Sequence, residues 1–340
     1  MSGINNALVA AVIKYCSEIG TDPLLVQGAG GNVSWKEGDT LWVKASGTWL
    51  ADASNKDIFV PVNLPHLRAA IQSGDFTVIP QPLGESLLRP SIETLLHALM
   101  PHRIVMHLHA IEILAHLVRK DCQTTFQRLL APSINWALVD YHKPGADLAK
   151  AVHSVLGQKS VTDVIFLKNH GVVIGGNSVT DIKNTLNELT SALCTTPAEI
   201  ISGKTEGTMP ALFDQYLPVQ DEKISQLALN TELFQRLNME WVLYPDHAVF
   251  LGVRSYTYNS LQDFANQINS YQEQPELVFI RNIGVFVKST FNKAKYAQLR
   301  CYVDILTRQG LDSNILALSE MQISELLNWD AEKYRQHLSA

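Results

Sequence analysis

A pair of histidines, His107 and His109, ends the apolar run 104–109. On a β-strand, residues two apart point to the same face, so the two imidazoles can converge on one ion. A third histidine, His170, follows about sixty residues later in the strand–turn sequence 167–171 (LKNHG). Three neutral nitrogen ligands leave coordination positions open for a substrate, as in catalytic rather than structural zinc sites. The types and spacing of these residues therefore predict a catalytic metal site.

Glu93 is a candidate general base for such a site. Residues 90–93 (PSIE) are predicted to open a helix that runs to about Met100, because proline suits the first turn and a carboxylate favours the positive end of the helix dipole. Helix capping alone also selects glutamate at this position, so both interpretations stay open at this point. His97 is expected on the same helix face, where it either hydrogen-bonds to Glu93 or is a structural histidine.

Two loops rich in small residues are candidates for anion binding. They span residues 28–32 (GAGGN) and 44–48 (KASGT). Consecutive backbone N–H groups in such loops form anion-binding nests, and Lys44 and Arg89 flank the loops with positive charge. The alternative is that the glycines only permit tight turns.

The composition is that of an ordinary globular protein. The chain has 340 residues, of which 46% are hydrophobic and 18% charged, and its formal net charge is -6. No long basic stripe occurs, so nucleic acid is not an expected partner. The four cysteines lack a C-x-x-C pair and indicate small buried residues in a reducing compartment. Neither a secretory signal nor an apolar stretch of about 20 residues is visible, so we expect a cytoplasmic protein with no membrane partner.

The elements expected around these residues mix hairpins with helices. This pattern favours an α+β fold with a largely antiparallel sheet over a doubly wound one. Residues 200–211 lose periodicity and gather Ser, Gly, Thr and Pro, which predicts a linker between domains at 1–208 and 209–340. The second domain is expected to be a small α/β unit. Its predicted elements include a helix at 221–236 and strands near 241–243, 248–251, 277–280 and 284–288.

Five short motifs in order resemble those of the class II aldolase/adducin family, which includes fuculose-1-phosphate and rhamnulose-1-phosphate aldolases. They are 28–34 (GAGGNVS), 45–47 (ASG), 90–93 (PSIE), 107–109 (HLH) and 169–171 (NHG). The resemblance covers about residues 5–200. The short segment between Glu93 and His107 is more similar to the aldolase part of aldolase–dehydrogenase fusions. Ile92 stands where the fuculose-phosphate enzyme has a second serine. Within these 340 residues no Gly-x-Gly-x-x-Gly occurs, because Val33 takes the third glycine position.

The resemblance implies a three-layer αβα domain around a mainly antiparallel sheet, and a homo-oligomer such as a tetramer. It also implies a divalent metal, Zn²⁺ or another such as Mn²⁺ or Co²⁺, held by His107, His109 and His170, with Glu93 as the acid/base. A small phosphorylated sugar would be the substrate. The residues carried over or flanking its site are Gly30, Gly31, Asn32, Lys44, Ser46, Gly47, Arg89 and Ser91.

The function that the sequence favours is a metal-dependent lyase. Such an enzyme cleaves a phosphorylated ketose or related sugar by a retro-aldol reaction through an enediolate. A decarboxylase, epimerase or dehydratase that uses the same metal site stays open, because the metal and the enediolate serve all of these reactions. A non-catalytic, adducin-like scaffold is the third alternative, although a scaffold has no use for three ligands and a carboxylate.

Overall fold

A seven-stranded sheet forms the centre of the N-terminal part of the chain, in the order β3-β2-β1-β4-β7-β6-β5. The computed structural model describes residues 6–159, 161–199, 215–310, 313–327 and 330. Neighbouring strands are antiparallel except β5 and β6. This pairing confirms the predicted antiparallel α+β sheet. The strands are β1 (Asn32–Glu37), β2 (Thr40–Lys44), β3 (Phe59–Asn63), β4 (Ile104–Leu108), β5 (Trp136–Val139), β6 (Val164–Leu167) and β7 (Gly171–Gly176).

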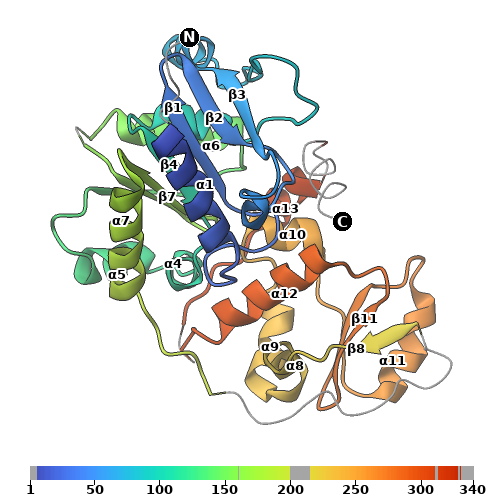
Figure 1. Cartoon of the computed structure of the whole chain (residues 1–340). Coiled ribbons are helices and arrows are strands. Elements are labelled where there is room, and N and C mark those ends of the chain that lie inside the picture. The colour runs from blue at the N-terminus through green and yellow to red at the C-terminus, as the bar shows by residue number, and fades with distance from the viewer. Residues whose placement is uncertain (1–5, 160, 200–214, 311–312, 328–329, 331–340) are drawn as a thin grey trace.

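Helices cover both faces of this sheet, which gives the expected three layers (Figure 1). Successive residues of β4 alternate between the layers, since Ile104 and Met106 join one apolar cluster and Val105 another. On the first face lie α1 (Asn6–Gly20), α4 (Ile111–Leu117), α5 (Cys122–Leu129) and α7 (Val179–Ala192). On the second face lie α2 (Leu64–Ser73), α3 (Thr94–Leu99) and α6 (Ala146–Leu156). A separate 3-10 turn, η1, spans Leu50–Asp52.

The start of α3 differs from the prediction of a helix opening at residue 90. Pro90 instead forms a bridge with Ala45, and the Ser91 N–H donates to the Lys44 carbonyl at 3.2 Å. The chain is therefore held extended against the end of β2, and the helix begins at Thr94. Glu93 is the residue that precedes the helix rather than part of its first turn.

The C-terminal unit, defined here as residues 215–327, holds a second sheet in the order β8-β11-β10-β9. The predicted strands at 277–280 and 284–288 are confirmed as β10 and β11. The strands are β8 (Tyr216–Pro218), β9 (Thr257–Tyr258), β10 (Leu277–Ile280) and β11 (Gly284–Lys288). The helices are α8 (Glu222–Leu229), α9 (Thr231–Met239), α10 (Pro245–Leu251), α11 (Leu261–Gln267), α12 (Lys293–Leu306) and α13 (Glu320–Leu327), with a 3-10 turn, η3, at Ile268–Ser270.

Three predictions for this unit are wrong. The helix expected at 221–236 is broken at Asn230, whose side chain accepts the backbone N–H groups of Glu232 and Leu233 and so begins a new helix, α9. Residues 241–243 form no strand, and 248–251 lie in helix α10. Residues 245–250 are buried all round, and a short apolar run buried on every side has no periodicity that separates a strand from a helix.

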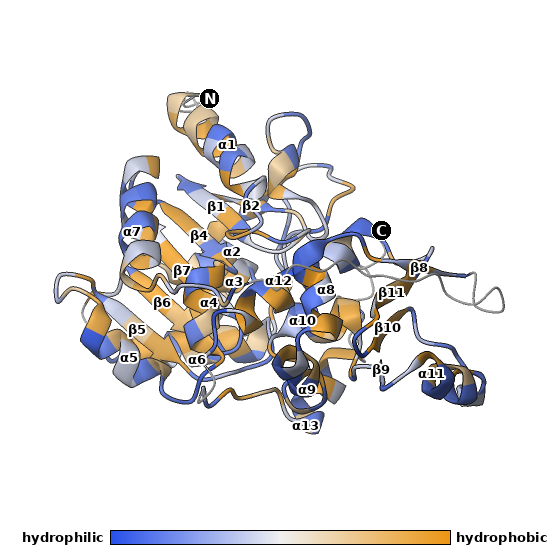
Figure 2. Cartoon of the chain, turned by 90° about the horizontal axis from the view of Figure 1, so that it is seen from below, coloured by the Kyte–Doolittle hydropathy of each residue, from blue (hydrophilic) through white to orange (hydrophobic). Residues whose placement is uncertain are grey.

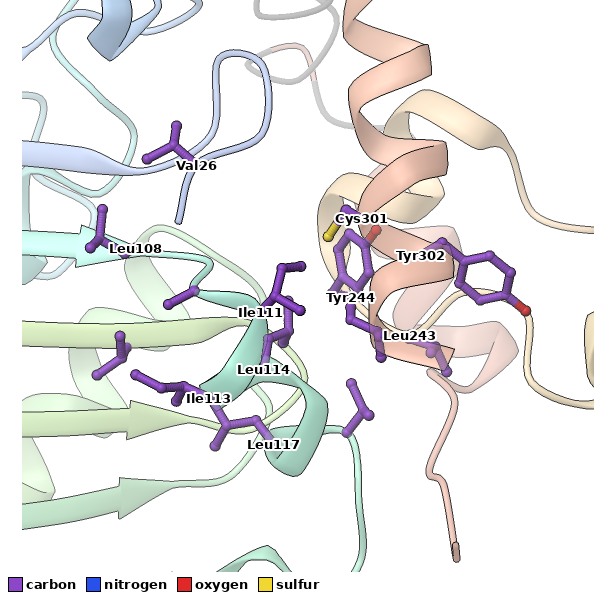
Figure 3. Close-up of a cluster of buried hydrophobic side chains, with 14 of the residues drawn as sticks. Val26, Leu108, Ile111, Ile113, Leu114, Leu117, Leu243, Tyr244, Cys301 and Tyr302 are labelled. Carbon is purple, nitrogen blue, oxygen red and sulfur yellow. The ribbon is translucent and has the colours of Figure 1, made fainter. Parts of the chain in front are cut away.

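One hydrophobic cluster includes residues of both the C-terminal unit and the N-terminal unit, residues 6–199. Figure 2 shows the strands β4, β6 and β7 of the large sheet as strongly hydrophobic. An ion pair of 2.8 Å between Arg308 and Glu112 also joins the units. The predicted linker and the boundary at 208/209 lie outside the described residues, so the two-domain division stays a prediction. The apolar contact, drawn in Figure 3, sets Ile111, Leu114 and Leu117 of α4 against Leu243, Tyr244 and Cys301.

Across the described ranges, no helix is both long enough and apolar enough to span a bilayer.

Candidate metal and catalytic site

The three predicted ligands lie together in the structure. His107 is in β4, His109 follows that strand, and His170 is in the turn between β6 and β7. Because β4 pairs with β7, with His107 opposite Val173, the turn lies beside the end of β4. One ligand atom from each of the three buried histidines lies within 4.8 Å of the others.

The donor set fits a divalent metal such as zinc. The Nε2 atoms of His107 and His109 are 3.2 Å apart. Two nitrogens bound to one tetrahedral zinc at about 2.0–2.1 Å would be about 3.3 Å apart. The His107 Nδ1 lies 3.1 Å from the Val172 carbonyl and donates to it in the tautomer that leaves Nε2 free to ligate. Burial lowers the pKa of His170 to about 3, so this imidazole is neutral and able to ligate at neutral pH.

The carboxylate of Glu93 faces the same nitrogens. Its Oε2 lies 3.6 Å from His107 Nε2, and its Oε1 lies 3.4 Å from His170 Nε2. The backbone N–H of Glu93 donates to Ser91 Oγ at 3.2 Å, which helps to fix the residue before α3. The backbone N–H of His97 donates to the Glu93 carbonyl at 3.3 Å, but its imidazole is directed elsewhere: Nδ1 lies 2.8 Å from Ser34 Oγ, and burial holds the pKa of His97 well below the usual range. The structure thus favours the structural alternative for His97.

A small cavity of about 30 Å³ opens beside these groups, between the two predicted loops and the start of α10. Lys44 lies in its wall, where its Nζ donates to the carbonyls of Ala29 at 3.1 Å and Thr48 at 2.6 Å and so ties the two loops together. The predicted residues that line the cavity are Gly31, Lys44, Ser46, Gly47, Ser91, Glu93, His109 and His170.

Besides His107, three predicted residues lie outside that lining. Arg89 is exposed, and its carbonyl accepts the Ser46 N–H at 2.9 Å. Asn32 is buried, and within the described ranges neither polar atom of its amide has a hydrogen-bond partner, a state that indicates a ligand or water. The Gly30 N–H donates to the Gln27 carbonyl at 3.0 Å, so this N–H is not available to bind an anion.

Glycines are required here because the backbone approaches the histidines closely. A Cβ at Gly171 would lie 2.4 Å from the Leu108 carbonyl oxygen and 3.1 Å from ring atoms of His107 and His109. A Cβ at Gly30 would lie 3.2 Å from His109 Nδ1. At these two positions the absence of a side chain lets the loops pack against the histidine cluster.

One site residue was missed by the sequence analysis: Asp246, in the first turn of α10. It is 2% exposed, lines the cavity, and places Oδ2 at 3.6 Å from His109 Nδ1. The available signal was an acidic residue inside the apolar segment 241–251, since a carboxylate in such a segment is buried only with partners.

Comparison with known proteins adds the family. Residues 10–195 match the Class II Aldolase and Adducin N-terminal domain. The chain is 27% identical over 187 residues to the "Uncharacterized oxidoreductase YuxG" of Bacillus subtilis, a match that covers 50% of this chain but only 27% of that protein. This agrees with the expected similarity to one part of longer fusion proteins.

Solved structures of the N-terminal part are also similar. The N-terminal class II aldolase domain of a conserved protein from Thermoplasma acidophilum is 27% identical, with a TM-score of 0.47, and the match covers 57% of this chain and 94% of that one. The L-fuculose-1-phosphate aldolase from Thermus thermophilus is 15% identical, with a TM-score of 0.39, and the match covers 56% and 93%. Because the matching domain covers more than half of the chain, this protein belongs to the class II aldolase and adducin family.

Proposed function

We propose that this protein is a divalent-metal-dependent carbon–carbon lyase that cleaves a small phosphorylated ketose, or a related sugar, by a retro-aldol reaction. The observation that carries the proposal is the cluster of three buried histidines with the Glu93 carboxylate at 3.4–3.6 Å from two of them. His107, His109 and His170 would hold the metal. A homo-oligomer is part of the proposal, and light scattering of the purified protein measures its state.

The metal and the protein would have different roles in the reaction. A bound divalent cation would supply Lewis-acid stabilisation of the negative charge that develops on a substrate oxygen. Glu93 lines the cavity beside the ligand nitrogens, so its carboxylate can take a proton from the carbon next to a substrate carbonyl and later return it. Ser46, Ser91 and the backbone of Gly47 line the same cavity and supply hydrogen bonds to the substrate.

The proposed phosphate contacts are more limited than the motifs alone implied. Asn32, with its unpartnered buried amide, is the best-supported contact. Lys44 contributes a buried positive charge near the loops, whereas the exposed Arg89 side chain is proposed only as an outer contact. The cavity is far below the roughly 300–1,000 Å³ of typical ligand pockets, so a ketose phosphate requires its walls to move apart.

The same residues support an alternative. A decarboxylase or epimerase that acts on a sugar or sugar-acid phosphate would use the same histidine cluster and the same enediolate chemistry. A cavity of about 30 Å³ has room for about one water molecule, so this alternative also requires the walls to move apart. A dehydratase shares the chemistry but has no separate support, and a scaffold needs no buried ligand cluster. Metal analysis of the purified protein excludes the scaffold if the metal is stoichiometric.

The test is exchange of a substrate proton. The metal-loaded protein is incubated with dihydroxyacetone phosphate in deuterated water, and the hydroxymethylene protons are followed by NMR. Stereospecific exchange that is lost on chelation is expected, and Glu93→Gln should slow it by about 10²–10⁴-fold, the usual contribution of a general base. Absence of exchange in protein that holds metal would overturn the proposed aldolase and favour the decarboxylase or epimerase.

A further inference from the structure

We propose that Asp246 is a positioning residue of the metal site, supplied by the C-terminal unit. It holds the Nδ1–H of His109 so that Nε2 faces the metal, and it thereby couples metal affinity to the packing of α10. The inference rests on the proposed metal site. Asp246 lies outside residues 10–195, the part of the chain that matches the family, so the family match assigns it no role.

The contact between Asp246 and His109 has the geometry that this role needs. Asp246 Oδ2 lies 3.6 Å from His109 Nδ1, while the opposite ring atom, Nε2, faces His107. At 3.6 Å the contact is electrostatic rather than a hydrogen bond. A neutral imidazole carries one proton, so a metal at Nε2 places that proton on Nδ1, directly beside the carboxylate.

Burial makes this contact strong. Asp246 is 2% exposed and His109 is 4% exposed, so water screens their interaction little. A carboxylate beside the protonated ring nitrogen of a ligating histidine favours that tautomer and ring orientation and raises the basicity of the ligand. His107 obtains the equivalent support from a backbone carbonyl, that of Val172. His109 therefore differs in taking its support from a remote side chain.

A buried chain of amides fixes the position of the carboxylate. Gln298 in α12 donates from Nε2 to Asp246 Oδ2 at 3.2 Å and to the Gln27 carbonyl at 3.4 Å. Gln27 in turn donates from its side chain to the His109 carbonyl at 3.4 Å. This series of hydrogen bonds begins in the C-terminal unit and ends at the backbone of His109. It therefore fixes the positions of α12, α10 and the glycine-rich loop around His109.

The two glutamines of this hydrogen-bond network are shielded from water. Both are buried, at 2% exposure for Gln27 and 1% for Gln298. Gly30 completes the arrangement, because a Cβ there would meet both His109 Nδ1 at 3.2 Å and Asp246 Oδ2 at 3.3 Å. The Gln27 carbonyl oxygen would be closer still, at 2.9 Å, so the loop packs against the carboxylate–imidazole pair with no room for a side chain at residue 30.

The experiment measures Zn²⁺ affinity by competition with a chromophoric chelator. Asp246→Ala is expected to weaken Zn²⁺ binding by about 10–100-fold, the usual cost of losing such a partner. Asp246→Asn should weaken it less, because the amide oxygen keeps a partial negative charge beside the Nδ1–H. The visible spectrum of the Co²⁺-loaded protein supplies the second readout, since a reoriented His109 changes the ligand field and a purely structural effect does not.

Asp304→Asn is the matched control. Asp304 is also a buried aspartate of the C-terminal unit, 1% exposed, but it pairs with Arg300 at 3.0 Å and Lys223 at 3.3 Å rather than with a ligand. This variant should lower the thermal midpoint without changing Zn²⁺ affinity or the Co²⁺ spectrum. Gln298→Leu, which removes the donor to Asp246 and leaves the carboxylate, should give an intermediate loss of affinity.

Two results would overturn the inference. One is a folded Asp246→Ala protein that binds Zn²⁺ within about twofold of the wild type, well short of the expected loss. The other is a loss in Asp304→Asn as large as that in Asp246→Ala. If Asp246→Ala does not fold, Asp246→Asn and Gln298→Leu decide in the same way. Failure of the wild-type protein to bind metal would instead refute the proposed metal site itself, so the two failures are distinguishable.

Discussion

Asn169, the residue before His170, links the two units and gives a test of how much that link contributes to stability. Its Nδ2 donates to the carbonyl of Leu243 at 2.9 Å and to that of Leu316 at 2.7 Å. Its φ of 52° lies in the left-handed region. Two substitutions test the link. Asn169→Gly removes both hydrogen bonds, and glycine adopts the left-handed conformation without strain. Asn169→Ala removes both hydrogen bonds and also strains the backbone.

The expected magnitudes follow from these two features. Two hydrogen bonds contribute about 1–3 kcal/mol together, and glycine adds about 0.4–1 kcal/mol of chain entropy, so Asn169→Gly should lose about 1.5–4 kcal/mol. For Asn169→Ala, the left-handed conformation adds about 1–2 kcal/mol to the lost bonds, for a total of about 2–5 kcal/mol. Alanine should therefore be the less stable of the two variants.

The assay is urea unfolding of the metal-free protein, and Asn282 is the matched control. Asn282 has a φ of 58°, is exposed, and its side chain has no hydrogen bond in the described part of the chain. Asn282→Gly should stay within about 1 kcal/mol of the wild type. If Asn169→Gly and Asn282→Gly lost the same stability, the two carbonyl contacts would contribute nothing, and the reasoning would be refuted.

Three other predictions concern the histidines. Gly171→Ala should abolish stoichiometric metal, measured by elemental analysis after dialysis, because its Cβ would lie 2.4 Å from the Leu108 carbonyl; retained metal would show that the turn yields. Burial lowers the pKa of both His170 and His247 to about 3, so unfolding takes up protons below the unfolded value of 6.5. The free energy of unfolding of the metal-free protein should thus be highest above that pH and fall toward pH 3, by up to about 1.4 kcal/mol per pH unit for each histidine; a flat profile from thermal melts would contradict this. His247→Phe should remove one histidine's share of that slope, and an unchanged slope would mean that His247 does not stay neutral.

Much of the scaffold of the site could be predicted from sequence. The apolar run at 104–109 forms the strand β4, Ile104–Leu108, and the strands expected at 277–280 and 284–288 have the same bounds in the structure. Each is an apolar run or an amphipathic segment between turn residues, so local pattern and burial agree. The histidine cluster could also be predicted. Residues two apart on a strand face the same side, which aligns His107 with His109, and the antiparallel pairing of β4 with β7 brings His170 beside them.

Other features depend on contacts that no local pattern reports. Residues 90–91 resemble a helix start, but pairing with the end of β2 keeps them extended. Arg89 is near the loops in sequence, yet its side chain is exposed. Gly30 and Gly171 suit tight turns, whereas the structure gives the physical reason as the closeness of imidazole rings. In each case a tertiary contact decides between two locally acceptable interpretations.

Asp246 is the clearest example, because the residue that it contacts lies far earlier in the chain and in a different unit. Two of the three proposed ligands are connected to the C-terminal unit: His109 through Asp246, and His170 through the preceding Asn169. Neither connection involves a bond to the proposed metal. Since the apolar contact between α4 and residues 243–244 sets the distance between the units, a substitution in that contact can alter the metal site without touching any ligand. If the three histidines hold the proposed metal, the C-terminal unit would therefore act on the site through the geometry of these ligands.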